Sequence, residues 1–523
     1  MNYVRESRFP LGFFKYAVFC VLFAALLVPA EAFGADDVKK IDFSDIEKLV
    51  KQAKKHARNG ETKEAEQILK GVIASNPNSS LAKLELALLY VKSRNLMAAY
   101  NYAADVVRAD PKNSYGFAVL GTVYLAAGNF ADAKMLLENS LSLENDQALA
   151  WASLGLLDYY ENRLNSSLIK LKRAFNEDSK EPDYPFALAQ VSARAERYKE
   201  AAEAYEDYLR NSGKGDQERR ERILGLIRFL RYLGRKTALY QLSGAESTSI
   251  DMNVVNNRPI VEVRIKKKGE PLRFVLDTGS GISVISNETA KRLNIKPVTS
   301  GGSARALGGD GKFDIVYGFL KNVYLGEVQV KNVPVYIREF HNTNEKIDGY
   351  VGVSLISKYL TTIDYGNNKF SLLRKDSKAA DTIEKEGNSL PLRLTSSGFL
   401  SGIVKLDGIE SPLNFIVDTG ASVSVIDAAL ADSSHISPHA LDETFRVVGA
   451  AGITENVPSF LLPRVSFGTF SRDSLKAIAL DLNLINESSG FTQAGILGGN
   501  FLRNYSLTFD FRRSKVTFTP HNK

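Results

Sequence analysis

The chain has 523 residues, of which 44% are hydrophobic and 24% charged, a composition typical of globular proteins and not of disordered or fibrous ones. A chain of this length is too long for one hydrophobic core, so two to four domains are expected. The formal net charge of +7 is small for the length, and it gives no reason to expect a nucleic-acid partner.

The N-terminal segment has the features of a signal peptide. Basic residues precede an apolar run from Tyr16 to Ala30, and Ala30-Glu31-Ala32 fits a small-x-small cleavage site. The run, about 15 residues long, is short for a bilayer span. We therefore interpret residues 1–32 as a signal peptide of a periplasmic or secreted protein. The alternative is an uncleaved anchor, which would be the chain's only contact with a membrane.

The cysteine content agrees with export to a bacterial periplasm. The single cysteine, Cys20, lies inside the apolar run, so the mature chain would contain none. An exported protein without disulfides fits a bacterial periplasm better than a small extracellular domain held together by disulfide bonds.

Residues 40–242 read as successive helices with a period of 34 residues. A column of small residues contains Ala65, Ala99, Ala133, Ser167 and Ala201, a larger apolar column contains Leu69, Ala103, Leu137, Leu171 and Tyr205, and a turn column contains Gly60, Arg94, Gly128, Asn162 and Glu196. Small residues at one point let two helices approach closely, and the larger apolar residues fill the gap between them. The pattern, best seen from Leu120 to Ala133, resembles the tetratricopeptide repeat. This resemblance implies an all-α solenoid that binds a protein partner and has no catalytic role.

The segment after the fifth repeat, Glu218–Lys236, is rich in arginine. We interpret it as a capping helix with a solvated charged face. Contact of this face with an anionic lipid or an acidic partner is the alternative.

From about residue 249 the chain changes to short apolar runs separated by Gly, Asn and Asp turns, which predicts an all-β part. It divides into two lobes, residues 250–375 and 390–520, and the charged segment 376–389 is interpreted as a linker. Each lobe contains an Asp-Thr-Gly triplet between two apolar runs, and a glycine-rich segment begins 31 residues after each aspartate. The shared order of these landmarks indicates an internal duplication.

Two aspartates held close together cannot both ionise cheaply, so such a pair shares one proton and can serve as base and acid together. Each lobe resembles a retropepsin-type aspartic protease unit: apolar residues before Asp-Thr-Gly, a glycine-rich flap, and an apolar pair before a further glycine. The resemblance implies that Asp277 and Asp418 form the catalytic pair and that Thr278 and Thr419 cross-link their loops. The remaining implied site residues are Gly279 and Gly420 in the tight turns, Gly308, Gly309 and Gly311 in the first flap, and Gly449 and Gly452 in the second flap.

The chain departs from the family pattern in three places. The second flap, with Ala450 and Ala451, has fewer glycines than the first. Tyr350 stands where an aliphatic residue is usual, and neither flap has an aromatic residue that matches the flap tyrosine of pepsin-like enzymes. Phe313 and Tyr317 are only near that position.

The predicted fold class is multidomain: an all-α tetratricopeptide-repeat solenoid followed by an all-β bilobal retropepsin- or pepsin-like domain. The predicted function is an exported aspartic endopeptidase that acts on polypeptides, with the repeats recruiting a substrate or partner protein. No metal site or cofactor is expected, because the chain lacks a His-Glu-x-x-His run and a phosphate-binding loop. Two alternatives remain: a homodimer whose dyad forms between chains, and an inactive scaffold that binds extended peptides.

Overall fold

The computed structural model describes residues 43–521 except 237, 310, 342–344 and 379–387. The predicted signal peptide and most of the predicted linker therefore lie outside the described residues. Among the described helices, none combines the length and the hydrophobicity needed to cross a lipid bilayer.

The chain divides into two compact units, which are described separately. The first comprises Met1–Ser153 with Gly408–Pro412, and the second comprises Leu154–Asp407 with Leu413–Lys523. The predicted helical domain is thus shared between the two units, because its last helices group with the strands.

The first unit consists of paired helices. They are α1 (Phe43–Asn59), α2 (Thr62–Ser75), α3 (Ser80–Lys92), α4 (Leu96–Ala109), α5 (Ser114–Ala127), α6 (Phe130–Leu143) and the beginning of α7 (Ala148–Tyr160). The side chains of Asn95, Asn113 and Asn129 accept a main-chain hydrogen bond at the start of α4, α5 and α6. Such caps satisfy N–H groups that have no partner within the helix.

The small column and the turn column of the sequence lie where the repeat pattern predicts, at buried helix contacts and in turns. Every residue of the small column, Ala65, Ala99, Ala133, Ser167 and Ala201, is 0% exposed. Every residue of the turn column has a positive φ: 83° at Gly60, 63° at Arg94, 83° at Gly128, 60° at Asn162 and 60° at Glu196. A Cβ on Gly121 would lie 2.7 Å from Cγ of Leu137, so helices α5 and α6 approach too closely for a larger residue there. The predicted repeat solenoid is confirmed.

The second unit contains the end of α7, the helices α8 (Leu164–Glu177), α9 (Asp183–Arg194), α10 (Tyr198–Asn211) and α11 (Gln217–Leu233), and all the strands of the described residues. Gln241 and Leu242, which the sequence placed in the helical domain, belong instead to strand β1 (Gln241–Gly244). This strand pairs antiparallel with β8 (Val328–Arg338). The helical part ends earlier than predicted because α11 terminates at Leu233.

Each lobe is built from strands and a few short helices. Lobe 1 contains β2 (Ser247–Val255), β3 (Arg258–Val263), β4 (Leu272–Leu276), β5 (Val284–Ser286), α12 (Asn287–Arg292), β6 (Thr299–Arg305), β7 (Lys312–Leu325), β8, β9 (Gly349–Val351), α13 (Val353–Ile356), β10 (Tyr359–Asp364) and β11 (Lys369–Arg374). Lobe 2 contains β12 (Asn388–Pro391), β13 (Arg393–Leu394), β14 (Leu400–Leu406), β15 (Leu413–Val417), β16 (Ser424–Asp427), α14 (Ala428–Ala431), β17 (Ala440–Gly449), β18 (Gly452–Phe467), β19 (Phe470–Leu480), α15 (Asn483–Ser489), β20 (Gly495–Leu497), α16 (Gly499–Leu502), β21 (Tyr505–Asp510) and β22 (Lys515–Pro520).

The strand pairing repeats from one lobe to the other. In lobe 1, β9 lies parallel to β4 and antiparallel to β5, and β5 lies parallel to β8. In lobe 2, β20 lies parallel to β15 and antiparallel to β16, and β16 lies parallel to β19. The predicted duplication is therefore also a duplication of topology, and it places each Asp-Thr-Gly loop directly after the first strand of an equivalent set.

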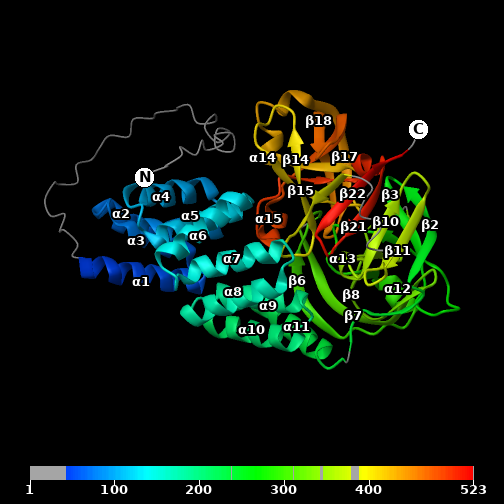
Figure 1. Ribbon diagram of the computed structural model, residues 1–523, viewed down its shortest axis with the longest axis horizontal. Helices are drawn as coiled ribbons and strands as arrows, with labels where there is room; N and C mark the ends of the chain where they lie inside the picture. The colour runs from blue at the N-terminus through cyan, green and yellow to red at the C-terminus, as the bar shows by residue number, and fades with distance from the viewer. Residues whose placement is uncertain (1–42, 237, 310, 342–344, 379–387, 522–523) are drawn as a thin grey trace. The chain divides into compact units, whose positions relative to one another are not determined.

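The two lobes are joined by a sheet that begins in the order β12-β22-β21-β10-β11-β2 and continues through the other strands of lobe 1. The lobes meet at the antiparallel pair of β10 from lobe 1 and β21 from lobe 2, which lie side by side in Figure 1. Asp364 and Asp510 end these two strands, and each carboxylate accepts main-chain N–H groups of the turn that follows. Their role is local and structural.

Candidate active site

The two Asp-Thr-Gly loops are held by equivalent main-chain hydrogen bonds. The N–H of Asp277 donates to the carbonyl of Val351, and the N–H of Asp418 donates to the carbonyl of Leu497, both at 3.0 Å. Because β9 and β20 provide these carbonyls, the apolar-apolar-glycine segments predicted from the sequence fix the positions of the aspartates.

The threonines of the two loops are cross-linked by reciprocal hydrogen bonds. The N–H of Thr278 donates to Oγ1 of Thr419 at 3.2 Å, and the N–H of Thr419 donates to Oγ1 of Thr278 at 3.0 Å. Each hydroxyl then donates across to the other lobe: Thr278 to the carbonyl of Val417 and Thr419 to that of Leu276, both at 2.7 Å. Both threonines are 0% exposed. Since unpaired buried polar groups are costly, this network strongly favours one relative position of the loops.

The glycines of the triplets bring the carboxyl groups together. The N–H of Gly279 donates to Oδ1 of Asp277 at 2.9 Å, and the N–H of Gly420 donates to Oδ1 of Asp418 at 2.7 Å. A Cβ on Gly279 would lie 2.4 Å from Cγ of Asp418, and one on Gly420 would lie 2.7 Å from Cγ of Asp277. Each carboxyl group therefore lies against the opposite loop, where only glycine leaves enough space.

The two carboxyl groups act on each other, and both have raised pKa values. Burial raises the pKa of Asp277, although hydrogen bonds from Ser280 and Asp418 and the positive charge of Arg338 lower it in part. Burial holds the pKa of Asp418 well above its ordinary value, and the negative charge of Asp277 raises it further. A close pair of this kind keeps one proton between its members over a wide pH range.

The tips of the two flap hairpins touch each other. We name β6–β7 the first flap hairpin and β17–β18 the second flap hairpin. The N–H of Gly309 donates to the carbonyl of Ile453 at 3.2 Å, and the N–H of Ala451 donates to the carbonyl of Leu307 at 3.0 Å. The flaps are therefore held tip to tip by main-chain hydrogen bonds.

The predicted flap glycines all lie at these tips. A Cβ on Gly308 would lie 2.2 Å from the carbonyl oxygen of Gly452, and one on Gly449 would lie 2.1 Å from that of Leu307. Positive φ angles of 99° at Gly308, 54° at Gly309, 75° at Gly311 and 140° at Gly452 also favour glycine. The flap glycines thus serve both turn geometry and contact between the flaps.

Arg338, at the end of β8, is a residue of this region that the sequence did not reveal. Its Nη1 donates to the carbonyl of Ala450 at the tip of the second flap hairpin, at 2.8 Å. Its positive charge also acts on Asp277. The guanidinium is therefore bonded to the second flap, and its charge lowers the pKa of Asp277. An isolated arginine at the end of a strand carries no sequence signal; only comparison of the two lobes marks it.

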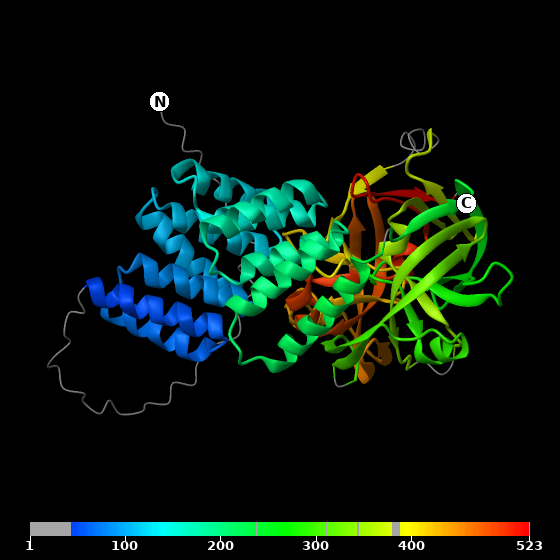
Figure 2. The ribbon, with the colours of Figure 1, turned by 90° about the horizontal axis from the view of Figure 1, so that it is seen from below.

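Helix α11 packs on the first flap hairpin, which the sequence also did not predict (Figures 1 and 2). The ring of Phe229 stacks on that of Tyr317, with centroids 4.3 Å apart. Arg228 donates to Oγ1 of Thr299 at 3.3 Å and to the carbonyl of Ser300 at 3.2 Å. Tyr317 is thereby buried against α11, so it does not act as a flap tyrosine above the aspartates.

The arginines of α11 only partly form the solvated face that was predicted. Arg228 and Arg231 are exposed, whereas Arg219 and Arg220 are half-buried. The Arg219 guanidinium lies 5.0 Å from the ring centroid of Phe186, and Arg220 donates to the carbonyl of Leu209 at 3.2 Å. Arg219 and Arg220 therefore pack against the fold instead of pointing into solvent. Long side chains can cover apolar surface while their polar ends bond to carbonyl groups.

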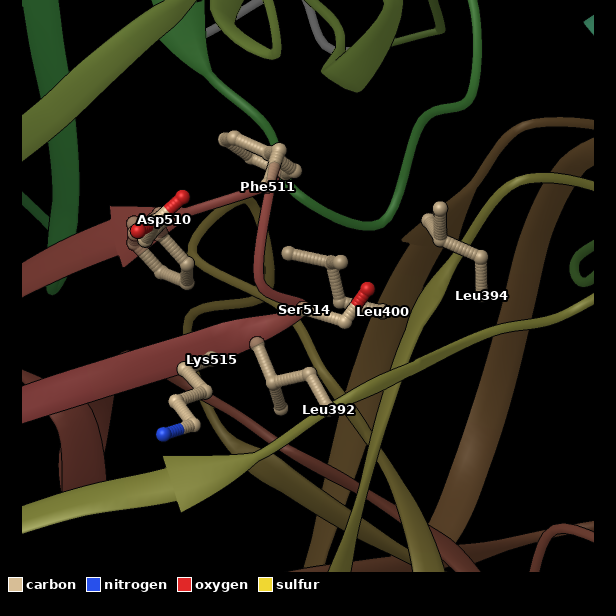
Figure 3. Close-up of a pocket in the computed structure, with 8 residues that line it drawn as sticks. Leu392, Leu394, Leu400, Asp510, Phe511, Ser514 and Lys515 are labelled. Atoms are coloured by element: carbon tan, nitrogen blue, oxygen red, sulfur yellow. The ribbon is translucent and has the colours of Figure 1, made fainter. Parts of the chain in front are cut away.

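Two hollows of the second unit lie apart from the aspartate pair. One is a cavity of about 10 Å³ lined by Leu392, Leu394, Leu400 and Phe511 together with neighbouring residues (Figure 3). It has room for about one water molecule. The other is an open depression of about 340 Å³ lined by residues from Glu196 to Leu239. Within the part of the chain that the structure describes, no cluster of His, Cys, Asp or Glu is arranged to hold a metal ion.

Two related lobes, a shared sheet and facing Asp-Thr-Gly loops joined by their threonines define the bilobal aspartic protease fold, formed here within one chain. An aspartyl protease family model matches residues 261–355 and 403–501, one segment in each lobe. A tetratricopeptide-repeat model matches residues 56–123. Both lobes therefore resemble aspartyl proteases of the retropepsin type, and tetratricopeptide repeats precede them in the chain.

Solved structures similar to the chain include a thermophilic tetratricopeptide-repeat protein of Thermus thermophilus, with 19% identity and a TM-score of 0.30, covering 35% of this chain and 98% of that one. Another is PilF of Pseudomonas aeruginosa, with 15% identity and a TM-score of 0.27, covering 36% of this chain and 86% of that one. No curated protein matches the chain.

Proposed function

We propose that the protein is an aspartic endopeptidase whose catalytic pair is Asp277 and Asp418. The observation that carries the proposal is the reciprocal Thr278–Thr419 bonding, which brings the two aspartate loops of one chain together. The raised pKa values of both carboxyl groups also support the proposal. A pair with one shared proton suits general acid–base catalysis near neutral as well as acidic pH.

In the proposed reaction, a water molecule lies between the two carboxyl groups. The ionised member takes a proton from this water, which attacks the scissile carbonyl, while the protonated member polarises the carbonyl oxygen. A proton is then passed to the leaving amine, so the dyad returns to its singly protonated state. The proton belongs to the pair, and neither aspartate is assigned a fixed role.

The flap hairpins would open to admit an extended polypeptide and then close over it. Main-chain groups of the flaps can pair with such a peptide as an added strand does. The contacts between the flap tips would be exchanged for contacts with the substrate. The repeats are proposed to recruit the substrate protein or a partner, since solenoids of this kind present extended binding surfaces.

The test uses the full chain, a diverse peptide mixture and the variants Asp277→Asn and Asp418→Asn. Each variant is expected to lower turnover about a thousandfold or more, because either change removes the shared proton system. Asp364→Asn is the matched control, because Asp364 lies at a strand end and its carboxylate caps a turn. Full activity in either dyad variant would refute the proposal.

Two further measurements on the wild-type protein test the alternatives of a dyad formed between chains and of an inactive scaffold. Activity that follows a dimer in sedimentation and disappears on dilution would favour a dyad formed between chains. A pepstatin-like inhibitor that raises the Tm, with no peptide cleaved by the wild type, would favour an inactive peptide-binding scaffold.

We also propose export to the periplasm, on the strength of the signal-peptide features of residues 1–32. N-terminal sequencing of protein from a fractionated bacterial expression host tests this. A mature N-terminus just after Ala32 in the periplasmic fraction is expected, and an intact N-terminus in the membrane fraction would favour an anchor.

A further inference from the structure

The duplicated topology shows which residues of the two lobes correspond. In lobe 1, Ser286 of β5 pairs with Arg338 of β8, and in lobe 2, Asp427 of β16 pairs with Leu480 of β19. The residues one and two positions earlier in each strand pair in the same way. Arg338 and Leu480 therefore occupy equivalent positions, one charged and the other apolar.

Strands β9 and β20, the neighbours of β5 and β16 in the sheets, also carry a polar residue in lobe 1 and an aliphatic one in lobe 2. In lobe 1, Tyr350 of β9 pairs with Val284, and in lobe 2, Ile496 of β20 pairs with Val425. Tyr350 and Ile496 are thus equivalent as well. Tyr350 is half-buried and lies near Arg338, whereas Ile496 is 7% exposed within an apolar cluster. Two corresponding positions are polar in lobe 1 and aliphatic in lobe 2.

Arg338 has unused hydrogen-bonding capacity beside the dyad. An arginine side chain has five N–H donors. Among the described residues, its one hydrogen bond is the bond to the carbonyl of Ala450, and it acts on Asp277 through its charge alone. The guanidinium lies 5.9 Å from the ring centroid of Phe313, 5.3 Å from that of Phe340 and 5.7 Å from that of Tyr350. A half-buried cation with free donors and aromatic neighbours is suited to binding an anionic group.

Leu480, unlike Arg338, lies in apolar surroundings. It packs with the apolar cluster of lobe 2 that includes Ile478, Ile485 and Ile496. The same cluster includes Leu307 from the tip of the first flap hairpin, and Ala421, the residue that follows the second Asp-Thr-Gly triplet. The first flap thus meets an apolar surface of lobe 2, whereas the second flap meets the guanidinium of lobe 1.

We propose that the two sides of the scissile bond are recognised differently: Arg338 binds a glutamate or aspartate side chain on one side, and the Leu480 surface binds an apolar side chain on the other. The inference rests on the proposed peptidase function, because it names the substrate class of the same site. A guanidinium in partly buried surroundings forms strong, paired hydrogen bonds to a carboxylate. A site built for such bonds discriminates against an analogue that lacks the charge.

The test compares four peptides with the full chain. Two carry glutamate on one side or the other of the scissile bond with leucine opposite, and two carry glutamine in place of the glutamate. One glutamate peptide is expected to exceed its glutamine counterpart in kcat/KM by roughly tenfold to a hundredfold, the range for a hydrogen bond to a charged group. Equal kcat/KM values for both pairs would overturn the inference.

Variants of Arg338 distinguish substrate recognition from a contact that only holds the flap. Arg338→Leu, which copies the residue of lobe 2, is expected to reduce the glutamate-to-glutamine ratio to about one, and Arg338→Lys is expected to retain part of the preference because it keeps the charge. A role in flap closure alone would lower kcat/KM for all four peptides by the same factor. That result would also overturn the inference.

A binding measurement separates this inference from the proposed function. Fluorescence anisotropy with the same labelled peptides and the Asp418→Asn protein reports recognition without turnover. Tighter binding of one glutamate peptide than of its glutamine partner, lost in the double variant with Arg338→Leu, supports the inference even if no peptide is cleaved. Equal binding of both pairs contradicts it, whatever the activity of the wild type.

Discussion

Gly225 of α11 lies directly against Gly301 of the first flap hairpin: a Cβ on Gly225 would lie 2.4 Å from the Cα of Gly301. Main-chain atoms cannot rotate away as a long side chain can, so this contact requires glycine in the helix. The contact joins the last helix of the repeat array to the hairpin whose tip bonds the second flap. Movements of α11 are therefore expected to reach the first flap.

The first prediction concerns this contact. Gly225→Ala is expected to destabilise the protein by about 1–3 kcal/mol, the usual cost of overpacking, and to lower kcat/KM because the flap is displaced. Gly71→Ala is the control, since no atom lies within 4 Å of a Cβ placed on that helical glycine. It should be neutral or stabilising by up to about 1 kcal/mol. Urea unfolding and peptide cleavage measure both effects; equal behaviour of the two variants would contradict the prediction.

The second prediction concerns the aromatic contact on the same helix. Phe229 is 3% exposed and stacks on Tyr317, so Phe229→Ala should cost about 3–5 kcal/mol. Leu224, on the same helix, is 44% exposed, and Leu224→Ala should change stability by less than about 0.5 kcal/mol. Hydrogen exchange should show faster exchange in β6 and β7 of the Phe229 variant only. Unchanged exchange there would mean that α11 does not support the flap.

The third prediction concerns the threonine cross-link. Thr419→Val keeps the shape of the side chain but removes the hydroxyl that bonds Leu276 and accepts from Thr278. Because both partners would then be buried without a hydrogen bond, a loss of about 1–3 kcal/mol in the free energy of unfolding is expected, together with reduced kcat. Thr419→Ser retains the hydroxyl and should retain most of both. A valine variant as stable and active as the serine variant would argue against the cross-link.

The fourth prediction concerns pH and stability. The pKa of Asp418 is raised in the folded protein, so above about pH 4, where a free aspartate ionises, the native state binds more protons than the unfolded state. Stability from this group therefore falls as pH rises towards the raised pKa. Asp418→Asn removes this penalty, so its Tm should exceed that of the wild type at pH 7.

The difference in Tm should shrink towards zero below about pH 4, where the aspartate is protonated in both states. Thermal unfolding of both proteins between pH 3 and pH 8 measures it, with Asp364→Asn as the control for loss of a carboxylate elsewhere. A difference that is constant with pH would mean that Asp418 has no raised pKa.

The features predicted from the sequence are those that repeat within it. The helical columns at Ala65 or Gly128 recur every 34 residues, and the Asp-Thr-Gly and flap glycines recur in each lobe, so each copy supports the other. These positions are constrained by backbone geometry, since they need a small side chain or a positive φ. Such requirements leave a visible pattern in one sequence.

The features missed are single contacts between distant segments. Phe229 and Tyr317 are ordinary apolar residues in their own helix and strand, and only the tertiary packing joins them. The correspondence of Arg338 with Leu480 needs the strand register, which a sequence pattern does not fix to a single residue. The end of the helical domain was also placed too late, because a short strand such as β1 is too brief to show a clear period.

The pairing of β10 with β21 also bears on how the chain folds. The hydroxyls of Thr362 and Thr508 bond across this pair at 2.9 Å, although 146 residues separate them. Until β21 is synthesised, a folded lobe 1 leaves one edge of β10 without a partner, and such an edge can pair with a strand of another molecule. Long-range strand pairing also forms slowly. The interval between synthesis of the two lobes is therefore when the chain is most exposed to aggregation, and slower translation there should reduce the yield of soluble protein.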